Sequence, residues 1–170
     1  MTDVIQRHQG VINKFTGDGI MAVFGVPILH SAPEEIAQDA HEAVACAVEM
    51  DERLASLNQR RAEQHLPLLK MRVGVFTGPV VVGSLGSKVR LEYGVIGDSV
   101  NTASRLESLE KDRQSTDCRI LIARQTLDHL GQAFSVEPWG SFNVKGKAET
   151  VEVFRVLGQH EEESGDREGI

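Results

Sequence analysis

Cysteine, basic charge and long apolar runs are all scarce in this sequence of 170 residues. Two cysteines cannot build a disulfide framework, and Cys46 lies on an apolar helical stripe, which predicts a reduced core thiol and a cytoplasmic location. A net charge of −7 argues against general binding to nucleic acid or to membrane surfaces. No apolar run approaches the ~18 residues of a membrane span, so we expect no direct membrane contact from this segment, although a parent protein could be membrane-anchored.

The length and the apolar fraction of 41% fit one folded domain with a real core. Most of the excess acid is local, because residues 160–168 carry five acidic side chains. We therefore expect a folded domain over residues 1–157 and an acidic disordered tail over residues 158–170.

Hydrophobic periodicity and turn residues predict the order of the elements. A short helix over 3–8 precedes a hairpin with strands at 11–16 and 20–24, and a long amphipathic helix follows from a cap at Ser31 and Glu34. Strands at 71–77 and 80–83 are interpreted as a second hairpin. Asp98 is expected to cap a helix with Val100, Ala103, Leu106 and Leu109 as its buried stripe. A strand at 119–122, a short helix at 124–130 and strands at 134–139 and 151–157 complete the chain.

This order predicts an α+β fold, a ferredoxin-like βαββαβ with extra C-terminal strands. An antiparallel sheet would carry helices on one face. The chain opens inside a helix with no strand before it, so the first strand of this pattern is expected to be missing.

The Gly17-Asp18-Gly19 turn joins the two strands of the first hairpin. Its glycines supply the positive φ that a tight turn needs, so the turn holds the Asp18 carboxylate at the tip of a rigid element. A divalent metal could use that carboxylate. The alternative is that Asp18 only forms the turn.

Two further groups carry polar side chains suited to phosphate. Asn101 and Arg105 are four residues apart, hence on one helix face, where an amide beside a guanidinium suits phosphate oxygens. The alternative for Arg105 is an ion pair with Glu107 or Glu110. Lys145, in a Lys-Gly-Lys turn between the last two strands, could hold a polyphosphate or could belong to an ordinary basic turn.

Three segments together resemble the class III adenylate and guanylate cyclase catalytic domain. They are NKFTGDGIMAVFG at 13–25, YGVIGDSVNTASR at 93–105 and FNVKGK at 142–147, in the family's order and at compatible spacing. The resemblance covers roughly residues 3–157 and implies conversion of ATP to 3′,5′-cyclic AMP and pyrophosphate. It also implies two Mg²⁺ or Mn²⁺ ions per active site, which assist in-line attack by the ribose 3′-hydroxyl on the α-phosphate.

Roles follow from the resemblance position by position. Asp18 matches a metal-binding aspartate, Lys14 the lysine that reads the adenine, and Asn101 the asparagine that orients the ribose. Arg105 matches the arginine that stabilises charge on the α-phosphate, and Lys145 the lysine that holds the terminal phosphates. The family's active sites lie at the interface of a head-to-tail homodimer, so Lys14 and Asp18 would serve opposite sites.

Two departures from the family pattern affect these expectations. The family's other metal aspartate lies on a first strand that would precede Met1, so we expect little turnover from this chain by itself. Gly94 stands where adenylate cyclases usually carry a side chain that contacts the adenine amino group.

Three hypotheses follow from these observations. The first is an adenylate cyclase catalytic domain. The second is a catalytically degenerate, cyclase-like domain that binds nucleotide or dimerises without turnover. The third is an unrelated ferredoxin-like module for a small ligand.

Overall fold

The computed structural model describes residues 1–28, 30–87, 90–143 and 150–160. Its centre is a four-stranded sheet in the order β3 (Met71–Val75), β6 (Cys118–Ala123), β8 (Thr150–Gln159) and β7 (Phe134–Asn143). β3 and β6 run parallel, and the other neighbours are antiparallel. The predicted α+β class is confirmed. The sheet was predicted to be antiparallel throughout, but β3 and β6 form one parallel pair.

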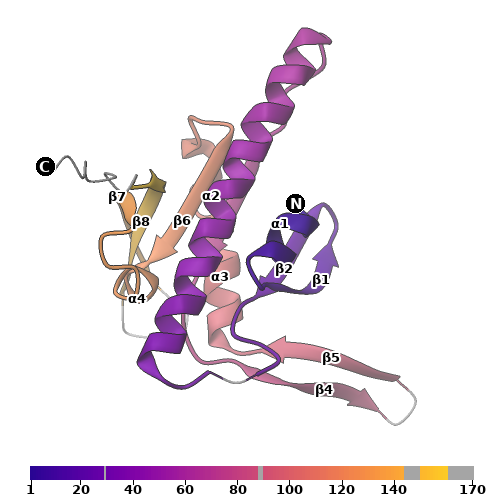
Figure 1. Ribbon diagram of the computed structural model, residues 1–170, viewed down its shortest axis with the longest axis vertical. Coiled ribbons are helices and arrows are strands. Elements are labelled where there is room, and N and C mark those ends of the chain that lie inside the picture. Colours follow the sequence, from indigo (N-terminus) through magenta and orange to yellow (C-terminus); the bar gives the residue numbers. More distant parts are fainter. Residues whose placement is uncertain (29, 88–89, 144–149, 161–170) are drawn as a thin grey trace, which may run out of the picture.

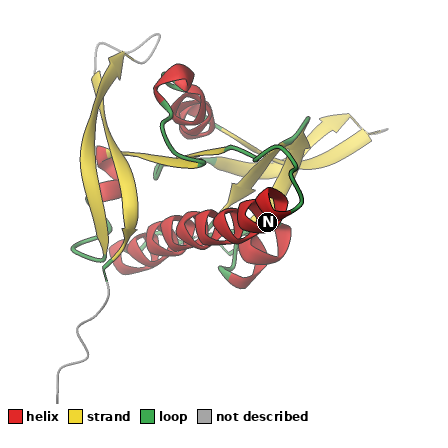
Figure 2. Ribbon diagram, turned by 90° about the horizontal axis from the view of Figure 1, so that it is seen from above, coloured by secondary structure: helices red, strands yellow, loops and turns green. Residues whose placement is uncertain are grey.

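Two helices cover opposite faces of this sheet, as Figure 2 shows: α2 (Pro33–Glu63) and α3 (Asp98–Ser108). Ile120 and Ile122 of β6 pack into the cluster with α2, whereas Leu121 and Ala123 pack into the cluster with Leu106 of α3. The helices expected on one face are thus divided between two. The reason lies in β6, whose six residues are all buried, the pattern of a strand covered on both sides.

The second hairpin differs from the sequence prediction. β4 (Val81–Ser87) pairs with β5 (Arg90–Ile96), while β3 pairs with β6, so the expected hairpin between 71–77 and 80–83 was wrong. A parallel pair needs a crossover connection, and the chain makes it through β4, β5 and α3. Figure 1 shows β4 and β5 projecting away from the rest of the molecule.

The first hairpin is as predicted. α1 (Thr2–Arg7) leads into β1 (Val11–Thr16) and β2 (Gly19–Val23), beside α2 in Figure 1. Val4 and Ile5 of α1 form a buried cluster with Cys46 and Met50 of α2. Burial raises the pKa of the Cys46 thiol to about 11, consistent with the predicted core thiol. Within the described part of the chain, β2 pairs only with β1, and β3 has a strand only on its β6 side.

The start of α2 is shifted slightly from its prediction. The helix begins at Pro33, and Glu35 rather than Glu34 accepts the capping hydrogen bonds, from the backbone N–H of Ala32 at 3.2 Å and of Ser31 at 3.3 Å. The helix ends at Glu63, within the polar stretch Asn58–Gln64 where the sequence predicts its end. No helix among the described residues is long and apolar enough to cross a lipid bilayer.

The face that α3 buries also differs from its prediction. Asp98 is the first helical residue and Gly97 is the cap. The buried residues are Ser99, Thr102 and Leu106, so only Leu106 of the predicted stripe is fully buried. Sequence periodicity missed the two hydroxyl residues because they bond to backbone: Ser99 Oγ donates to Pro79 O at 2.7 Å, and Thr102 Oγ1 to Asp98 O at 2.9 Å. The remaining short elements are η1 (Lys111–Arg113) and α4 (Arg124–Leu127).

Gly74 of β3 allows α3 to lie directly on the sheet. A Cβ added there would come within 2.3 Å of Ala103 O and 2.5 Å of Glu107 N, both backbone atoms of α3. Side chains of any size are therefore excluded from this position unless the helix moves outward.

We predict that Gly74→Ala lowers the free energy of unfolding by roughly 2 kcal/mol, because overpacking displaces the helix backbone. The matched control is Gly83→Ala on β4, where an added Cβ meets nothing within 4 Å. Chemical denaturation of both variants measures the difference, and equal stability of the two would contradict the close-packing argument.

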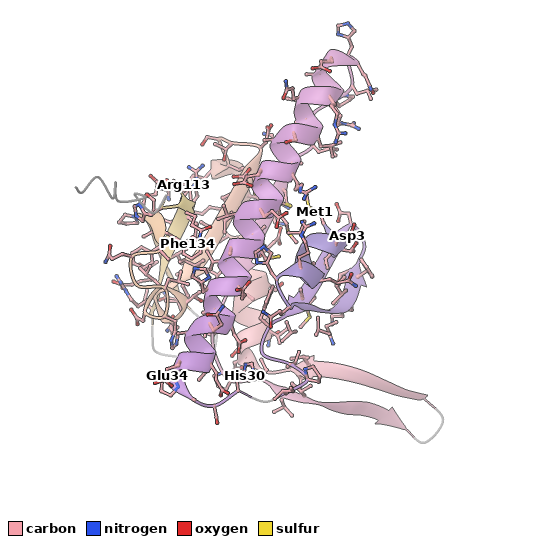
Figure 3. The ribbon with its side chains drawn as sticks, viewed as in Figure 1. Met1, Asp3, His30, Glu34, Arg113 and Phe134 are labelled. Carbon is pink, nitrogen blue, oxygen red and sulfur yellow. The ribbon has the colours of Figure 1, made fainter. Side chains whose placement is uncertain are left out.

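The loop between β2 and α2 is tied to the helix by an ion pair. His30 Nδ1 lies 2.7 Å from Asp39 Oδ2, and Figure 3 shows His30 beside the N-terminal end of α2, near Glu34. The hydrogen bond to Asp39 raises the pKa of His30 above its ordinary value of 6.5, with a further contribution from Glu35.

We predict that this pair stabilises the fold at low pH. Because the pKa of His30 is higher in the folded state than its ordinary value of 6.5, the pair adds to the free energy of unfolding. This contribution is complete below pH 6.5 and is lost as the pH rises through the raised pKa. The melting temperature of the wild type should exceed that of His30→Gln most below pH 6.5, with the gap closing at higher pH. Asp39→Asn should show the same pH dependence of the melting temperature as His30→Gln. If the difference from the wild-type melting temperature does not change with pH in either variant, the stabilising role of this pair is refuted.

Candidate active site

Asp18 lies at the tip of the first hairpin. Thr16 and Gly19 are paired across the strands, so Gly17 and Asp18 form a two-residue turn. Gly17 has a φ of +62°, which an L side chain rarely adopts, and Asp18 follows in the second turn position. The Asp18 carboxylate is exposed, and no hydrogen-bond or ion-pair partner engages it among the described residues.

Lys14 projects from β1 on the same hairpin. It is paired across the strands with Met21, and the register shifts between Ile12 and Lys14, which leaves Asn13 as an extra residue. Such a bulge twists a strand and redirects the side chains next to it. Lys14 is exposed, and within the described part of the chain its ammonium has no partner either.

Asn101 and Arg105 lie one turn apart on α3, as predicted. Asn101 is exposed and Arg105 is half-buried. The alternative ion pairs for Arg105 are not formed: Glu107 bonds to Arg72 Nε at 2.8 Å, and Glu110 to Arg113 Nη1 at 3.1 Å. Among the described residues nothing engages the Arg105 guanidinium.

The structure brings the predicted residues together as two separate pairs. Lys14 and Asp18 belong to a hairpin packed against α1 and α2, while Asn101 and Arg105 belong to α3 on the other face of the sheet. Lys145 lies outside the described residues. No group of three or more histidine, cysteine or acidic side chains that could hold a metal occurs in the described ranges, and Asp18 therefore belongs to no such group there.

A small apolar hollow, which sequence reasoning missed, lies between the first hairpin and β5. Its volume is about 180 Å³. The lining residues are Val11, Ile12, Asn13, Val23, Val26 and Val95. Lys14 directly follows one lining residue in sequence, and Gly94 directly precedes another. Residues distant in sequence thus line one apolar hollow.

The comparison with protein families decides the assignment. A model of the adenylate and guanylate cyclase catalytic domain matches residues 1–158. The chain belongs to this cyclase family. The hypothesis of an unrelated ferredoxin-like module is therefore wrong.

Several cyclases are similar to the chain. Adenylate cyclase 1 of Rhizobium meliloti is 32% identical over 157 residues, which is 92% of this chain but 22% of that protein. The crystal structure of the guanylyl cyclase Cya2 is 37% identical, with a TM-score of 0.78 over 96% of this chain and 77% of that one. The adenylyl cyclase CyaB from P. aeruginosa is 30% identical, with a TM-score of 0.79 over 94% and 77%. The chain therefore spans about a fifth of the length of the first of these relatives.

Proposed function

We propose that this cyclase domain is an adenylate cyclase, which converts ATP to 3′,5′-cyclic AMP and pyrophosphate at the interface of a homodimer. The observation that carries the proposal is the state of Arg105. Two neighbouring carboxylates, Glu107 and Glu110, are each engaged by another arginine, which leaves the Arg105 guanidinium available to a ligand. A half-buried, unengaged guanidinium is suited to bind phosphate oxygens.

Asn101 and Arg105 act together on the reacting groups. Asn101 orients the ribose, so that its 3′-hydroxyl faces the α-phosphate. Arg105 stabilises the negative charge that develops on the α-phosphate oxygens, an electrostatic role whose strength depends on a fixed position. Helix α3 provides that position for both side chains.

The hollow beside the first hairpin is suited to the purine ring. Its lining is apolar apart from Asn13, and Lys14 can donate to adenine N1, which accepts, whereas guanine carries a proton there. Gly94 has no side chain with which to read the adenine amino group. Base selectivity therefore rests on Lys14, in line with the similarity to Adenylate cyclase 1, although the guanylyl cyclase Cya2 is also similar.

Asp18 fits a divalent metal such as Mg²⁺ or Mn²⁺. Its carboxylate is exposed and unengaged, and such ions are commonly held by one or two carboxylates together with substrate phosphates. When bound, the metals would activate the ribose hydroxyl and neutralise charge on the leaving pyrophosphate. Lys145 is proposed, from the sequence motif alone, to hold the terminal phosphates.

A second copy of the chain would complete the site. Asp18 lies on a different element from Asn101 and Arg105, and the two hairpin residues are expected to serve opposite sites, which fits a site shared between two subunits. Large apolar side chains are exposed on both hairpins: Phe15 at 64%, Val81 at 64% and Ile96 at 49%. Val81 and Ile96 are also paired across β4 and β5. Exposed apolar side chains of this size suit a subunit interface.

We further propose that full turnover needs the second metal carboxylate of the family, on a strand before Met1. The chain preceded by such a strand is called the extended form below. The chain is proposed to bind nucleotide, and to do so in the cytoplasm.

A catalytically degenerate, nucleotide-binding domain is the second candidate. Gly94 favours it, because the missing side chain weakens recognition of the base. A substitution of Arg105 distinguishes the two candidate functions, because in an enzyme this side chain acts mainly on the transition state.

We predict that Arg105→Ala in the extended form lowers kcat for cyclic AMP formation by about 100-fold or more, with a much smaller change in KM for ATP. The control is Arg53→Ala, an exposed arginine of α2 that pairs with Glu49. A coupled pyrophosphate assay with Mn²⁺ measures both constants. Absence of cyclic nucleotide from ATP and from GTP in the wild-type extended form would overturn the enzymatic proposal.

A further inference from the structure

Arg119 is the one charged side chain that is fully buried among the described residues. It lies on β6, with 1% of its surface exposed. Burial lowers the pKa of its guanidinium, the expected direction for a cation removed from water. Its Nε has no hydrogen-bond partner within the described part of the chain. A strand position between two helices would ordinarily hold an apolar residue, so this arginine needs an explanation.

The guanidinium is directed at the C-terminal end of α3. Nη2 donates to Glu107 O at 2.9 Å, and Nη1 donates to Glu110 O at 2.8 Å. The last carbonyls of a helix lack donors within the helix, and they form the negative end of its dipole. Glu107 lies in the last turn of α3, and Glu110 lies just past the helix end. Arg119 therefore supplies a donor to one last-turn carbonyl, a second donor to the segment that follows, and a complementary charge.

A second arginine holds the same turn of α3. Arg72 of β3 is the register partner of Arg119 in the parallel pair, and its Nε bonds to Glu107 Oε1 at 2.8 Å. Adjacent strands thus bind Glu107 by its carbonyl and by its carboxylate. Gly74 on β3 brings the same turn into backbone contact with the sheet. Arg105 lies two residues before Glu107, inside the turn that these contacts fix.

The single tryptophan of the chain lies beside this arginine. Arg113 stacks on the Trp139 ring at 3.9 Å, and Arg119 lies 5.5 Å from the same ring centre. Arg113 is exposed on the side of α2 away from Met1 and Asp3 (Figure 3), and it donates to Trp139 O at 2.8 Å. Trp139 fluorescence therefore reports on the end of α3.

Stability alone does not account for Arg119. Replacing a buried ion by an apolar side chain of similar volume is often neutral or stabilising. A methionine at position 119 would fill the space among the apolar residues of β6, but it would donate no hydrogen bond to the helix end. What the arginine adds is a fixed position for the last turn of α3.

We propose that Arg119 is a positioning residue for the cyclase reaction, holding the last turn of α3 so that Arg105 faces the α-phosphate. The expected effect of Arg119 on kcat rests on the proposed function. The contact between Arg119 and the end of α3 does not, because it follows from the hydrogen bonds above and is measurable without any substrate.

The test compares Arg119→Met and Arg119→Lys with the control Arg53→Met. Arg53 is an exposed arginine of α2, on the opposite face of the sheet from α3, and it pairs with Glu49. In the chain itself, hydrogen exchange of the amides of residues 105–109 and Trp139 emission are recorded together with thermal unfolding. In the extended form, kcat and KM for ATP are measured separately with Mn²⁺.

We expect Arg119→Met to remain folded and to exchange the last-turn amides of α3 about tenfold faster than the wild type. Its kcat should fall about tenfold or more, while its KM for ATP changes less than about threefold. The loss falls on kcat because small misplacements of catalytic groups act on the transition state. Arg119→Lys, which keeps the charge and can donate to one carbonyl, should recover part of kcat. Arg53→Met should retain the wild-type exchange and kcat.

Wild-type exchange and kcat in Arg119→Met would overturn the inference, as would an equal loss in Arg53→Met. If Arg119→Met does not fold, Arg119→Lys decides, and a wild-type kcat in that variant overturns the inference. If the wild-type extended form makes no cyclic nucleotide, the proposed function fails, whereas the exchange data still decide whether Arg119 clamps α3.

Discussion

The backbone contact between α3 and β3 at Gly74 is the constraint on which the candidate site depends. Because a Cβ at Gly74 would lie 2.3 Å from Ala103 O, the helix can rest on the sheet only where this residue has no side chain. The ion pair from Arg72 and the two hydrogen bonds from Arg119 then fix the last turn of the helix. Asn101 and Arg105 are consequently presented on a rigid element, a requirement for electrostatic stabilisation of a transition state.

Some polar side chains are engaged in ion pairs within the fold, whereas others have no partner within the described part of the chain and are free to contact a ligand. Glu107 and Glu110 have arginine partners, and His30 is paired with Asp39. Lys14, Asp18, Asn101 and Arg105 have no such partners among the described residues. These four are also the described residues to which the sequence motifs assign roles in the proposed site.

Local sequence patterns predicted the first hairpin, the long helix and the spacing of Asn101 and Arg105 well, because turn chemistry and helical periodicity act over a few residues. Long-range pairing was predicted less well: β3 joins β6 across more than forty residues rather than joining the next strand. Buried polar residues were missed for the same reason. Asn58 falls in a polar stretch, yet it is buried and bonds to Leu69 O and to Asp117 Oδ2, both at 2.8 Å. The two faces of β6 and the role of Arg119 likewise depend on contacts that only the folded chain brings together.

In the proposed dimer, Asp18 of one subunit and Arg105 of the other act in the same active site. The most direct measurement mixes two inactive variants of the extended form, Asp18→Asn and Arg105→Ala, and assays cyclic AMP formation. A shared site at a two-fold interface predicts that the mixture recovers about a quarter of wild-type activity, because half of the dimers are mixed and each has one intact site of two. A mixture as inactive as its components, with subunit exchange demonstrated, would contradict the account.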